Sequence, residues 1–324
     1  MMISALLTPA QRERILRAAT LAPSKHNTQP WWFRWDGANL EVHLDPERTL
    51  PVEDPDTREA HISCGAAAFA ARLGYASLGF GTAADLLPDE NAPGFLARVR
   101  ITDAAPDPLF ETLYWSLPDR KTHRAPFLET PIPPLFLEYM RDAARDEGTW
   151  LRVIERGPVY EHLLAVVREA TERETDQRRE ERAKWVDPPD AVHRRDVVPA
   201  RSLGPRPETP TGAVRDLAVG RDVSGRGTTA FEAAPALAVL ETRGDTRTAW
   251  LTAGQALLRV LVTGTRYGVA ASFANQPLEI PELREEVASD AKYYGTPQMV
   301  IRLGMGRDVP RTPRRPVTDV LGPE

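Results

Sequence analysis

The sequence predicts an α+β protein made of two tandem half-units in one chain. Helical and strand-like segments alternate along its 324 residues, and the strands are short. Two apolar stretches, residues 65–83 and 254–272, share a further pattern. Each opens with a glycine and has a second glycine at the same spacing, where a helix gives way to a strand: Gly65 and Gly79, then Gly254 and Gly268. We interpret the stretches as diverged copies of one unit, although any two Ala/Leu-rich helices look alike.

The first half-unit, residues 1–118, begins with a helix expected at residues 8–21. Thr8 suits the N-cap of this helix and Pro9 its first turn. The elements expected after it are strands at 31–35 and 40–44 joined by a turn at Asp36-Gly37, a long Ala-rich helix at 56–78 and a strand at 95–101.

The second half-unit, residues 119–324, restarts this pattern after Pro118. Its expected helices are 134–147, 158–185, 246–267 and 281–290, and its expected strands are 150–154, 235–241, 269–273 and 298–303. The second part of the 158–185 helix is almost wholly charged, so we expect residues 178–182 on a solvated face or a projecting end. Residues 186–230 are rich in Pro, Gly, Arg and Asp and predict one long irregular segment.

The composition argues against nucleic-acid, membrane and metal partners. A net charge of −5 disfavours a general nucleic-acid binder, and no apolar run approaches the roughly 20 residues that span a bilayer. Residues 1–7 lack the basic region and cleavage site of a signal peptide, and the single Cys64 allows no internal disulfide, so we expect a cytoplasmic location. The six histidines include no pair at metal-ligand spacing, and no side chain stands out as catalytic.

The loop at residues 22–31, Ala-Pro-Ser-Lys-His-Asn-Thr-Gln-Pro-Trp, is unusual for a connector. Two prolines fix φ at its two ends, and Ser24, Asn27 and Gln29 supply neutral donors and acceptors between them. This chemistry can hold a flat polar heterocycle without adding charge. The alternative is a structural turn whose amide side chains satisfy nearby backbone groups.

Residues 120–124, Arg-Lys-Thr-His-Arg, and the tail beyond the last strand carry the chemistry of a phosphate site. Guanidinium groups and a hydroxyl form charge-assisted hydrogen bonds to a phosphate monoester. In an extended segment, Arg120, Thr122 and Arg124 share one face. The tail adds Arg314 and Arg315 between two prolines. The alternatives are a solvated basic run and a frayed terminus.

Together these segments resemble the nitroreductase superfamily of flavin proteins. Residues 22–31 match a loop of the form APSxxNxQPW, residues 120–124 match an R-x-S/T-x-R phosphate element, and residues 297–304 match a closing strand that begins Pro-Gln and ends Leu-Gly. The order of the first two motifs is reversed relative to an ordinary member. This order resembles the Acg-like branch, in which two nitroreductase-like halves are fused.

The resemblance implies a nitroreductase-like three-layer αβα fold whose two half-units form an internal pseudo-dimer. It also implies one complete FMN site per chain and an empty reciprocal site. The implied cofactor-binding residues are Pro23, Ser24, Lys25, Asn27 and Gln29, then Arg120, Lys121, Thr122 and Arg124, then Gln276, Pro277 and Leu278, with Arg314 or Arg315 at the phosphate. Residues 186–230 are the candidate for a lid over the flavin.

Three functions remain open at this point. The first is reduction of nitro compounds or quinones by NAD(P)H through FMN. The second is an FMN store or sensor with a covered flavin and little turnover, and the third is a cofactor-free binding module that keeps only the fold. The expected partner is a small-molecule flavin, and fusion of the halves permits either a monomer or a homodimer.

Overall fold

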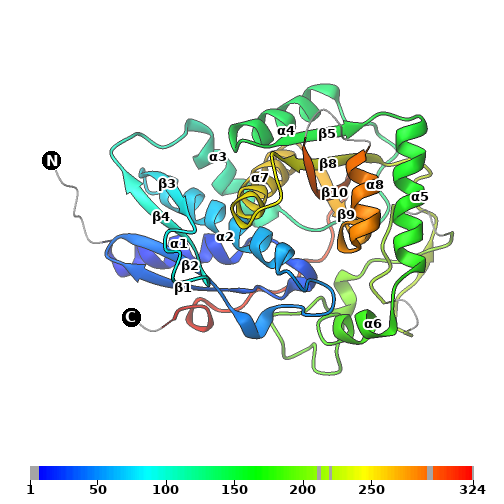
Figure 1. Ribbon diagram of the computed structural model, residues 1–324, viewed down its shortest axis with the longest axis horizontal. Helices are drawn as coiled ribbons and strands as arrows, with labels where there is room; N and C mark the ends of the chain where they lie inside the picture. Colours follow the sequence, from blue (N-terminus) through cyan, green and yellow to red (C-terminus); the bar gives the residue numbers. More distant parts are fainter. Residues whose placement is uncertain (1–6, 210–212, 219–220, 290–294, 323–324) are drawn as a thin grey trace.

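The computed structural model describes residues 7–209, 213–218, 221–289 and 295–322 (Figure 1). Its first sheet is antiparallel. The strands of this sheet, in hydrogen-bonded order, are β1 (Trp31–Asp36), β2 (Asn39–Leu44), β4 (Phe95–Thr102) and β3 (Gly81–Leu86). One face of it packs on α1 (Pro9–Thr20), α2 (Arg58–Ala76) and α3 (Pro108–Ser116) in a shared apolar core. The predicted α+β class is confirmed, and α3 is a helix that the sequence reading missed.

The second sheet is also antiparallel and has helices on both faces. Its strands, in hydrogen-bonded order, are β5 (Trp150–Ile154), β8 (Ala236–Thr242), β10 (Thr296–Met305) and β9 (Val269–Phe273). One face packs on α4 (Pro134–Asp146) and α7 (Arg247–Arg266), and the other on α5 (Pro158–Glu172) and α8 (Pro281–Ser289). These are the three αβα layers. The expected end of α8 at Asp290 lies outside the described residues.

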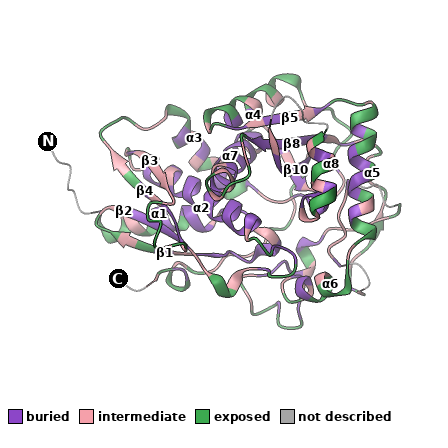
Figure 2. Ribbon diagram, viewed as in Figure 1, coloured by how far each residue is buried: buried purple, intermediate pink, exposed green. Residues whose placement is uncertain are grey.

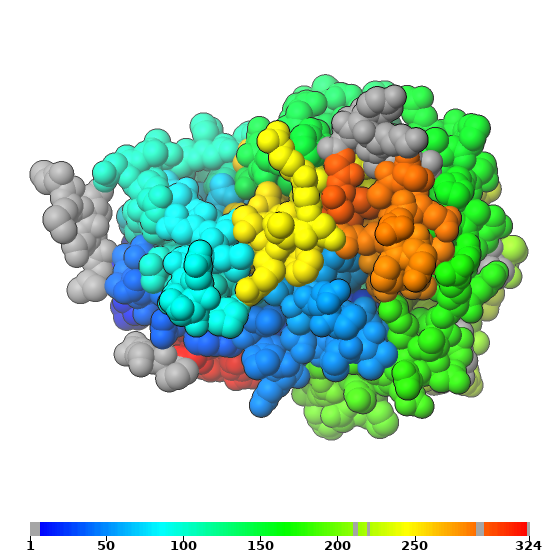
Figure 3. Space-filling view, viewed as in Figure 1, coloured from blue at the N-terminus to red at the C-terminus, as the bar shows by residue number. Residues whose placement is uncertain are grey.

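Both sheets order their strands in the same way along the chain. In each, the first strand pairs with the second, the second with the fourth and the fourth with the third. On the face shown in Figure 3, the blue and cyan residues of the first sheet and its helices lie directly against the yellow and orange residues of the later elements. Across the described part of the chain, no helix is both long and apolar enough to cross a membrane.

Two of the repeated glycines, Gly65 and Gly254, lie where α2 packs against α7. Figure 2 shows both helices as largely buried ribbons at the centre of the molecule. A Cβ added to Gly65 would overlap the backbone oxygen of Leu251, and one added to Gly254 would overlap that of Ile62. Hydrogen at these positions lets α2 and α7 approach backbone to backbone. The other two repeated glycines, Gly79 and Gly268, have the positive φ expected where a helix ends, at +83° and +75°.

We expect Gly65→Ala to lower the free energy of unfolding by about 1–3 kcal/mol, because the methyl group must push the two helices apart. Chemical unfolding measures this change. Gly94→Ala is the control, since a Cβ at Gly94 meets nothing within 4 Å. Equal stability of the two variants would mean that the helices do not need this close approach.

The prediction of a single helix at residues 158–185, with a solvated charged end, was wrong in two respects. It is two helices, because α5 ends at Glu172 and Thr175 caps a new one, α6 (Asp176–Ala183). Residues 178–182 are also not simply a solvated face. The Arg182 side chain is 3% exposed and pairs with Glu53 and Glu174, while Glu181 accepts hydrogen bonds from the backbone at residues 52 and 53. Charge density in the sequence gave no sign that these groups pair inside the protein.

Glu241 on β8 gives a pH dependence to the stability. Burial raises its pKa to about 7 despite the opposing effect of Arg152. The folded state therefore holds this proton more tightly than the unfolded state does. The resulting contribution to the free energy of unfolding is complete below about pH 4.5 and is lost as the pH rises toward 7. We expect the free energy of unfolding of the wild type to fall relative to that of Glu241→Gln between pH 5 and pH 8. A constant difference across this range would contradict the shift.

Candidate functional site

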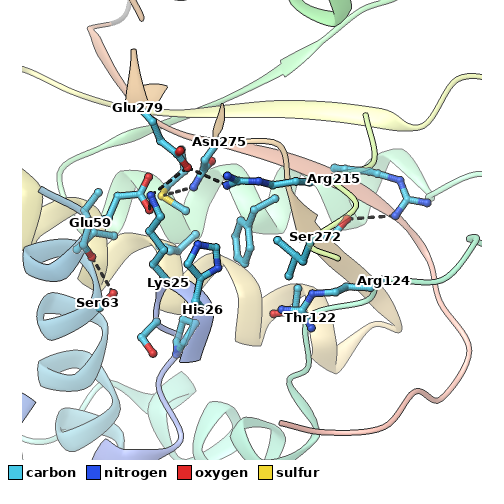
Figure 4. A pocket seen from close by; sticks show the side chains of 18 of the residues that line it. Lys25, His26, Glu59, Ser63, Thr122, Arg124, Arg215, Ser272, Asn275 and Glu279 are labelled. Carbon is cyan, nitrogen blue, oxygen red and sulfur yellow. Dashed lines mark hydrogen bonds and ion pairs between the residues drawn. The ribbon is translucent and has the colours of Figure 1, made fainter. Parts of the chain in front are cut away.

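The main cavity lies where the first half of the chain meets the second (Figure 4). The 22–31 loop and the start of α2 form one side, and the 120–124 segment, β9 and β10 form another. Its lining includes Pro23, Ser24, Lys25, His26, Glu59, Ser63, Thr122, Arg124, Arg215, Ser272, Asn275, Glu279 and Arg302. Val214 and Leu217 from the irregular 186–230 segment also line it.

The 22–31 loop is held in a conformation that side chains other than glycine rarely adopt. His26, Asn27 and Gln29 have φ values of +48°, +63° and +50°. Such backbone persists only where the surroundings fix it. One fixing contact is local, since the backbone N–H of Gln29 donates to Ser24 Oγ at 2.9 Å. The result is that Lys25 and His26 face the cavity.

Lys25 is surrounded by carboxylates rather than left free for a ligand. Its Nζ lies 3.0 Å from Glu279, 3.4 Å from Glu59 and 3.4 Å from Glu53. Burial alone would lower the pKa of Lys25, but these three carboxylates raise it above its ordinary value. The ammonium therefore stays charged and joins the loop to α2 and to the 276–279 turn.

Arg215 extends the same network from the irregular segment. Its guanidinium lies 2.9 Å from Glu279, 3.4 Å from Glu174 and 3.7 Å from Glu53. Glu53 also accepts from His26 Nε2 at 2.5 Å. Although burial opposes it, the charges of His26, Lys25 and Arg215 lower the pKa of Glu53. This end of the cavity is thus walled by buried ion pairs whose charges compensate one another.

The opposite end of the site carries positive charge that no carboxylate compensates within the described residues, from one buried and two half-buried arginines. A small second cavity is lined by Arg120, Arg124 and Arg314, which we call the anion cluster. Burial lowers the pKa of Arg120 and Arg124 to about 10 and that of Arg314 to about 9, and the arginines' mutual repulsion adds to the effect for Arg120 and Arg314. Within the described ranges, none of the three forms a salt bridge. Their neighbours Lys121 and Arg311 do, with Asp308 and Asp119.

The 120–124 segment reaches both cavities because it adds to the edge of the second sheet. Thr122 bridges to Ala271 on β9, and the N–H of His123 donates to Ala271 O at 2.8 Å. The segment is extended there, as expected, and Thr122 and Arg124 line both cavities. The two cavities are therefore neighbours that share Thr122 and Arg124, which are labelled in the view of the main cavity in Figure 4.

The two tail arginines have different positions. The Arg314 guanidinium lies in the anion cluster, where it donates to Asn27 Oδ1 at 2.8 Å and to Thr312 Oγ1 at 2.7 Å. Arg315 is directed elsewhere, toward the backbone oxygens of Gln29 and Trp31. Of the two alternatives that the sequence left open, the structure thus brings Arg314 to the cluster.

Comparison with known proteins decides the family. None of the protein-family models compared with the chain matches it. A Mycobacterium tuberculosis H37Rv protein named "Putative NAD(P)H nitroreductase Rv3131" is 32% identical over 315 residues, which cover 95% of this chain and 90% of that protein. This chain belongs to the nitroreductase family. A second M. tuberculosis H37Rv protein, named "Putative NAD(P)H nitroreductase acg", is 28% identical, and the match covers 94% of this chain and 93% of that protein.

The solved structures that this chain resembles are more distant in sequence. A nitroreductase with bound FMN from Desulfitobacterium hafniense has a TM-score of 0.40 and 13% identity, covering 64% of this chain and 95% of its own. One with bound FMN from Bacteroides fragilis has a TM-score of 0.37 and 14% identity, covering 60% of this chain and 88% of its own.

Not all of the residues proposed from the nitroreductase motifs line a cavity. Pro23, Ser24 and Lys25 line the main one and Lys121 the small one, whereas the Asn27 and Gln29 amides bond to backbone groups of residues 195–197 and 313–315. Gln276 donates to Thr171, and Leu278 packs in the core beside α5. Pro277 is buried in the same turn.

Several side chains that line the main cavity were missed in the sequence, namely His26, Glu59, Arg215, Ser272, Asn275, Glu279 and Arg302. Asn275 and Glu279 flank the proposed Gln276–Leu278 turn, so the motif pointed to the right turn but to other side chains. No pattern in the sequence singles out Arg215 within its irregular segment.

Proposed function

We propose that this nitroreductase binds FMN with the phosphate in the anion cluster. The observation that carries the proposal is one buried guanidinium, Arg120, and two half-buried ones, Arg124 and Arg314, gathered around one small cavity with no carboxylate partner among the described residues. Buried cations are normally paired, because an isolated charge is costly away from water. A phosphate dianion supplies the missing charge.

The unsatisfied atoms of the cluster fit such an anion. Arg120 Nε and Arg314 Nε are buried and have no hydrogen-bond partner in the structure. Planar guanidinium groups bind phosphate oxygens with two parallel hydrogen bonds, which is how such donors become satisfied. The Thr122 hydroxyl lies between the two cavities and can donate to a phosphate or to the chain that leads from it.

The flavin ring would then extend into the main cavity, where it supplies the hydride-transfer chemistry when bound. The residues of this chain would hold and shield it. Pro23, Ser24 and Ile62 offer a surface from the first half, and Phe273 and Met299 offer one from the second. The buried ion pairs of Lys25 and Arg215 close the far end against water.

We further propose that residues 1–118 and 119–324 are two nitroreductase-like halves paired as an internal pseudo-dimer with a single site. The common strand order of the two sheets supports the duplication. The 22–31 loop joins α1 to β1, whereas only residues 147–149 join α4 to β5. The second half therefore lacks a loop long enough to build a reciprocal site, and one chain holds all the elements of one site.

The proposed activity is reduction of a nitro compound or a quinone with NAD(P)H as the electron donor. Anaerobic titration of the FMN-loaded protein with NADPH and with NADH tests it through the flavin absorbance, followed by addition of a nitroaromatic or a quinone. Fast bleaching by a nicotinamide and recovery on adding the acceptor support the enzyme. An FMN-loaded protein that neither nicotinamide bleaches would contradict it.

A second candidate function, an FMN store or sensor with little turnover, is favoured by one observation. Val214, Arg215 and Leu217 of the 186–230 segment line the main cavity, as a lid would. A covered flavin would exclude bulky acceptors and slow the approach of a nicotinamide. Slow bleaching of a tightly bound flavin, accelerated when the segment is shortened, is the result expected for this function.

A further inference from the structure

Asn27 and Gln29 contact two segments that are distant in sequence. Asn27 Nδ2 donates to the backbone oxygens of Val197 and Pro313, each at 3.0 Å, and its Oδ1 accepts from Arg314. Gln29 Nε2 donates to Arg195 O at 2.9 Å, and its Oε1 accepts from the N–H of Arg315 at 2.9 Å. Each amide therefore bridges the 22–31 loop, the 195–197 stretch and the C-terminal tail.

These two side chains have no amide hydrogen left to donate to a flavin. Both amide hydrogens of Asn27 have a backbone acceptor and its oxygen has a charged donor. Gln29 is fully buried, and its Nε2 also donates to Asn27 O at 3.2 Å. Neither side chain lines the main cavity.

The segments that they hold contact the anion cluster. Arg124 donates to Ser202 O at 3.0 Å, and Ser202 Oγ donates to Arg311 O at 3.1 Å. Gly204 approaches Arg124 so closely that a Cβ there would overlap the Arg124 backbone oxygen. Pro310, Arg311 and Thr312 line the same small cavity. The 195–204 stretch and the tail thus meet beside the anion cluster, and Asn27 is bonded to Arg314 within it.

We propose that Asn27 and Gln29 are positioning residues that clamp the C-terminal tail and the 195–202 stretch over the phosphate end of the site. The amides fix Arg314 in the anion cluster and set how fast a bound phosphate-bearing cofactor leaves. They do so without contacting the ring. This inference rests on the proposed FMN site for its kinetic part, while the clamp itself is a property of the protein alone.

The test uses Asn27→Leu and Gln29→Met, which keep the number of side-chain heavy atoms and remove the hydrogen bonds. Loss of the hydrogen bond that the Arg314 guanidinium donates to Asn27 Oδ1 is expected to raise the FMN dissociation rate about tenfold or more. The absorption spectrum of the bound flavin should stay unchanged. An unchanged dissociation rate together with a shifted flavin spectrum would overturn the proposal, because it would indicate contact with the ring. Asn91→Leu, at an exposed turn, is the control.

A second measurement needs no cofactor and separates the clamp from the proposed function. In the apoprotein, both variants should be cut by trypsin after Arg311 or Arg314 at least about tenfold faster than the wild type, releasing the tail, while cleavage elsewhere is unchanged. Equal cleavage would overturn the clamp even if FMN binds. If the wild type binds no FMN but the variants release the tail, the proposed function fails and the clamp stands.

A wild-type measurement covers the case in which a variant does not fold. Bound inorganic pyrophosphate or FMN should slow tryptic cleavage after Arg311, because the anion and the clamp hold the same tail. FMN that is shown by its absorbance to be bound, and that still leaves this cleavage unchanged, would overturn the proposal.

Discussion

Replacing Arg120 and Arg124 together by alanine is expected to weaken FMN binding by at least about 100-fold. Each charge-assisted hydrogen bond to a phosphate contributes roughly 1.5–3 kcal/mol, and two are removed. The apoprotein should not become less stable in proportion, because neither the buried Arg120 nor the half-buried Arg124 has a carboxylate partner among the described residues. Fluorescence titration of the apoprotein with FMN measures the affinity, and thermal unfolding measures the stability.

Arg100→Ala with Arg145→Ala is the matched control, since it removes the same charge from exposed ion pairs far from the cavity. This control should leave FMN affinity within about twofold, because exposed pairs contribute little. A double Arg120/Arg124 variant that binds FMN as tightly as the control would mean that the anion cluster is not the phosphate site.

Replacing Arg215 by alanine is expected to release the cover of the main cavity. Removing one partner of a buried ion-pair network costs about 3 kcal/mol, because Glu53, Glu174 and Glu279 lose a shared cation. Local opening should then become about 100-fold more frequent. If opening limits access to the flavin, reduction by NADPH in a stopped-flow experiment should accelerate in the same proportion.

The control for this variant is Arg201→Ala, which removes an exposed arginine from the same 186–230 segment. It should leave both the reduction rate and the melting temperature unchanged. If Arg215→Ala lowers the melting temperature but not the time needed to reduce the flavin, then Arg215 stabilises the fold without gating the cavity.

The regular elements could be predicted from the sequence because their signals are local. Thr8 caps α1 in a full capping box, and the repeated glycines mark where two helices end and where they cross. Two members of the anion cluster could be proposed from the sequence for the same reason, since Arg120 and Arg124 lie with Thr122 in one extended stretch. Only the choice between Arg314 and Arg315 needed the path of the tail.

The remainder depended on contacts between distant segments. Lys25 looked available for a cofactor, yet Glu53, Glu59 and Glu279 reach it from three separate parts of the chain. Likewise, Asn27 and Gln29 are polar groups in a conspicuous loop, but their partners lie some 170 and 290 residues further along. Nothing in the sequence near a buried charge or amide identifies a partner that only the fold brings to it.

The central claim, one flavin site per chain held by its phosphate, is tested most directly by comparing FMN with riboflavin. The two ligands share the ring and differ by the phosphate that the anion cluster is proposed to bind. Calorimetric titration of the apoprotein should give one FMN per chain and a riboflavin affinity at least about 100-fold weaker. Equal affinities for the two flavins, or two FMN molecules bound per chain, would contradict the account.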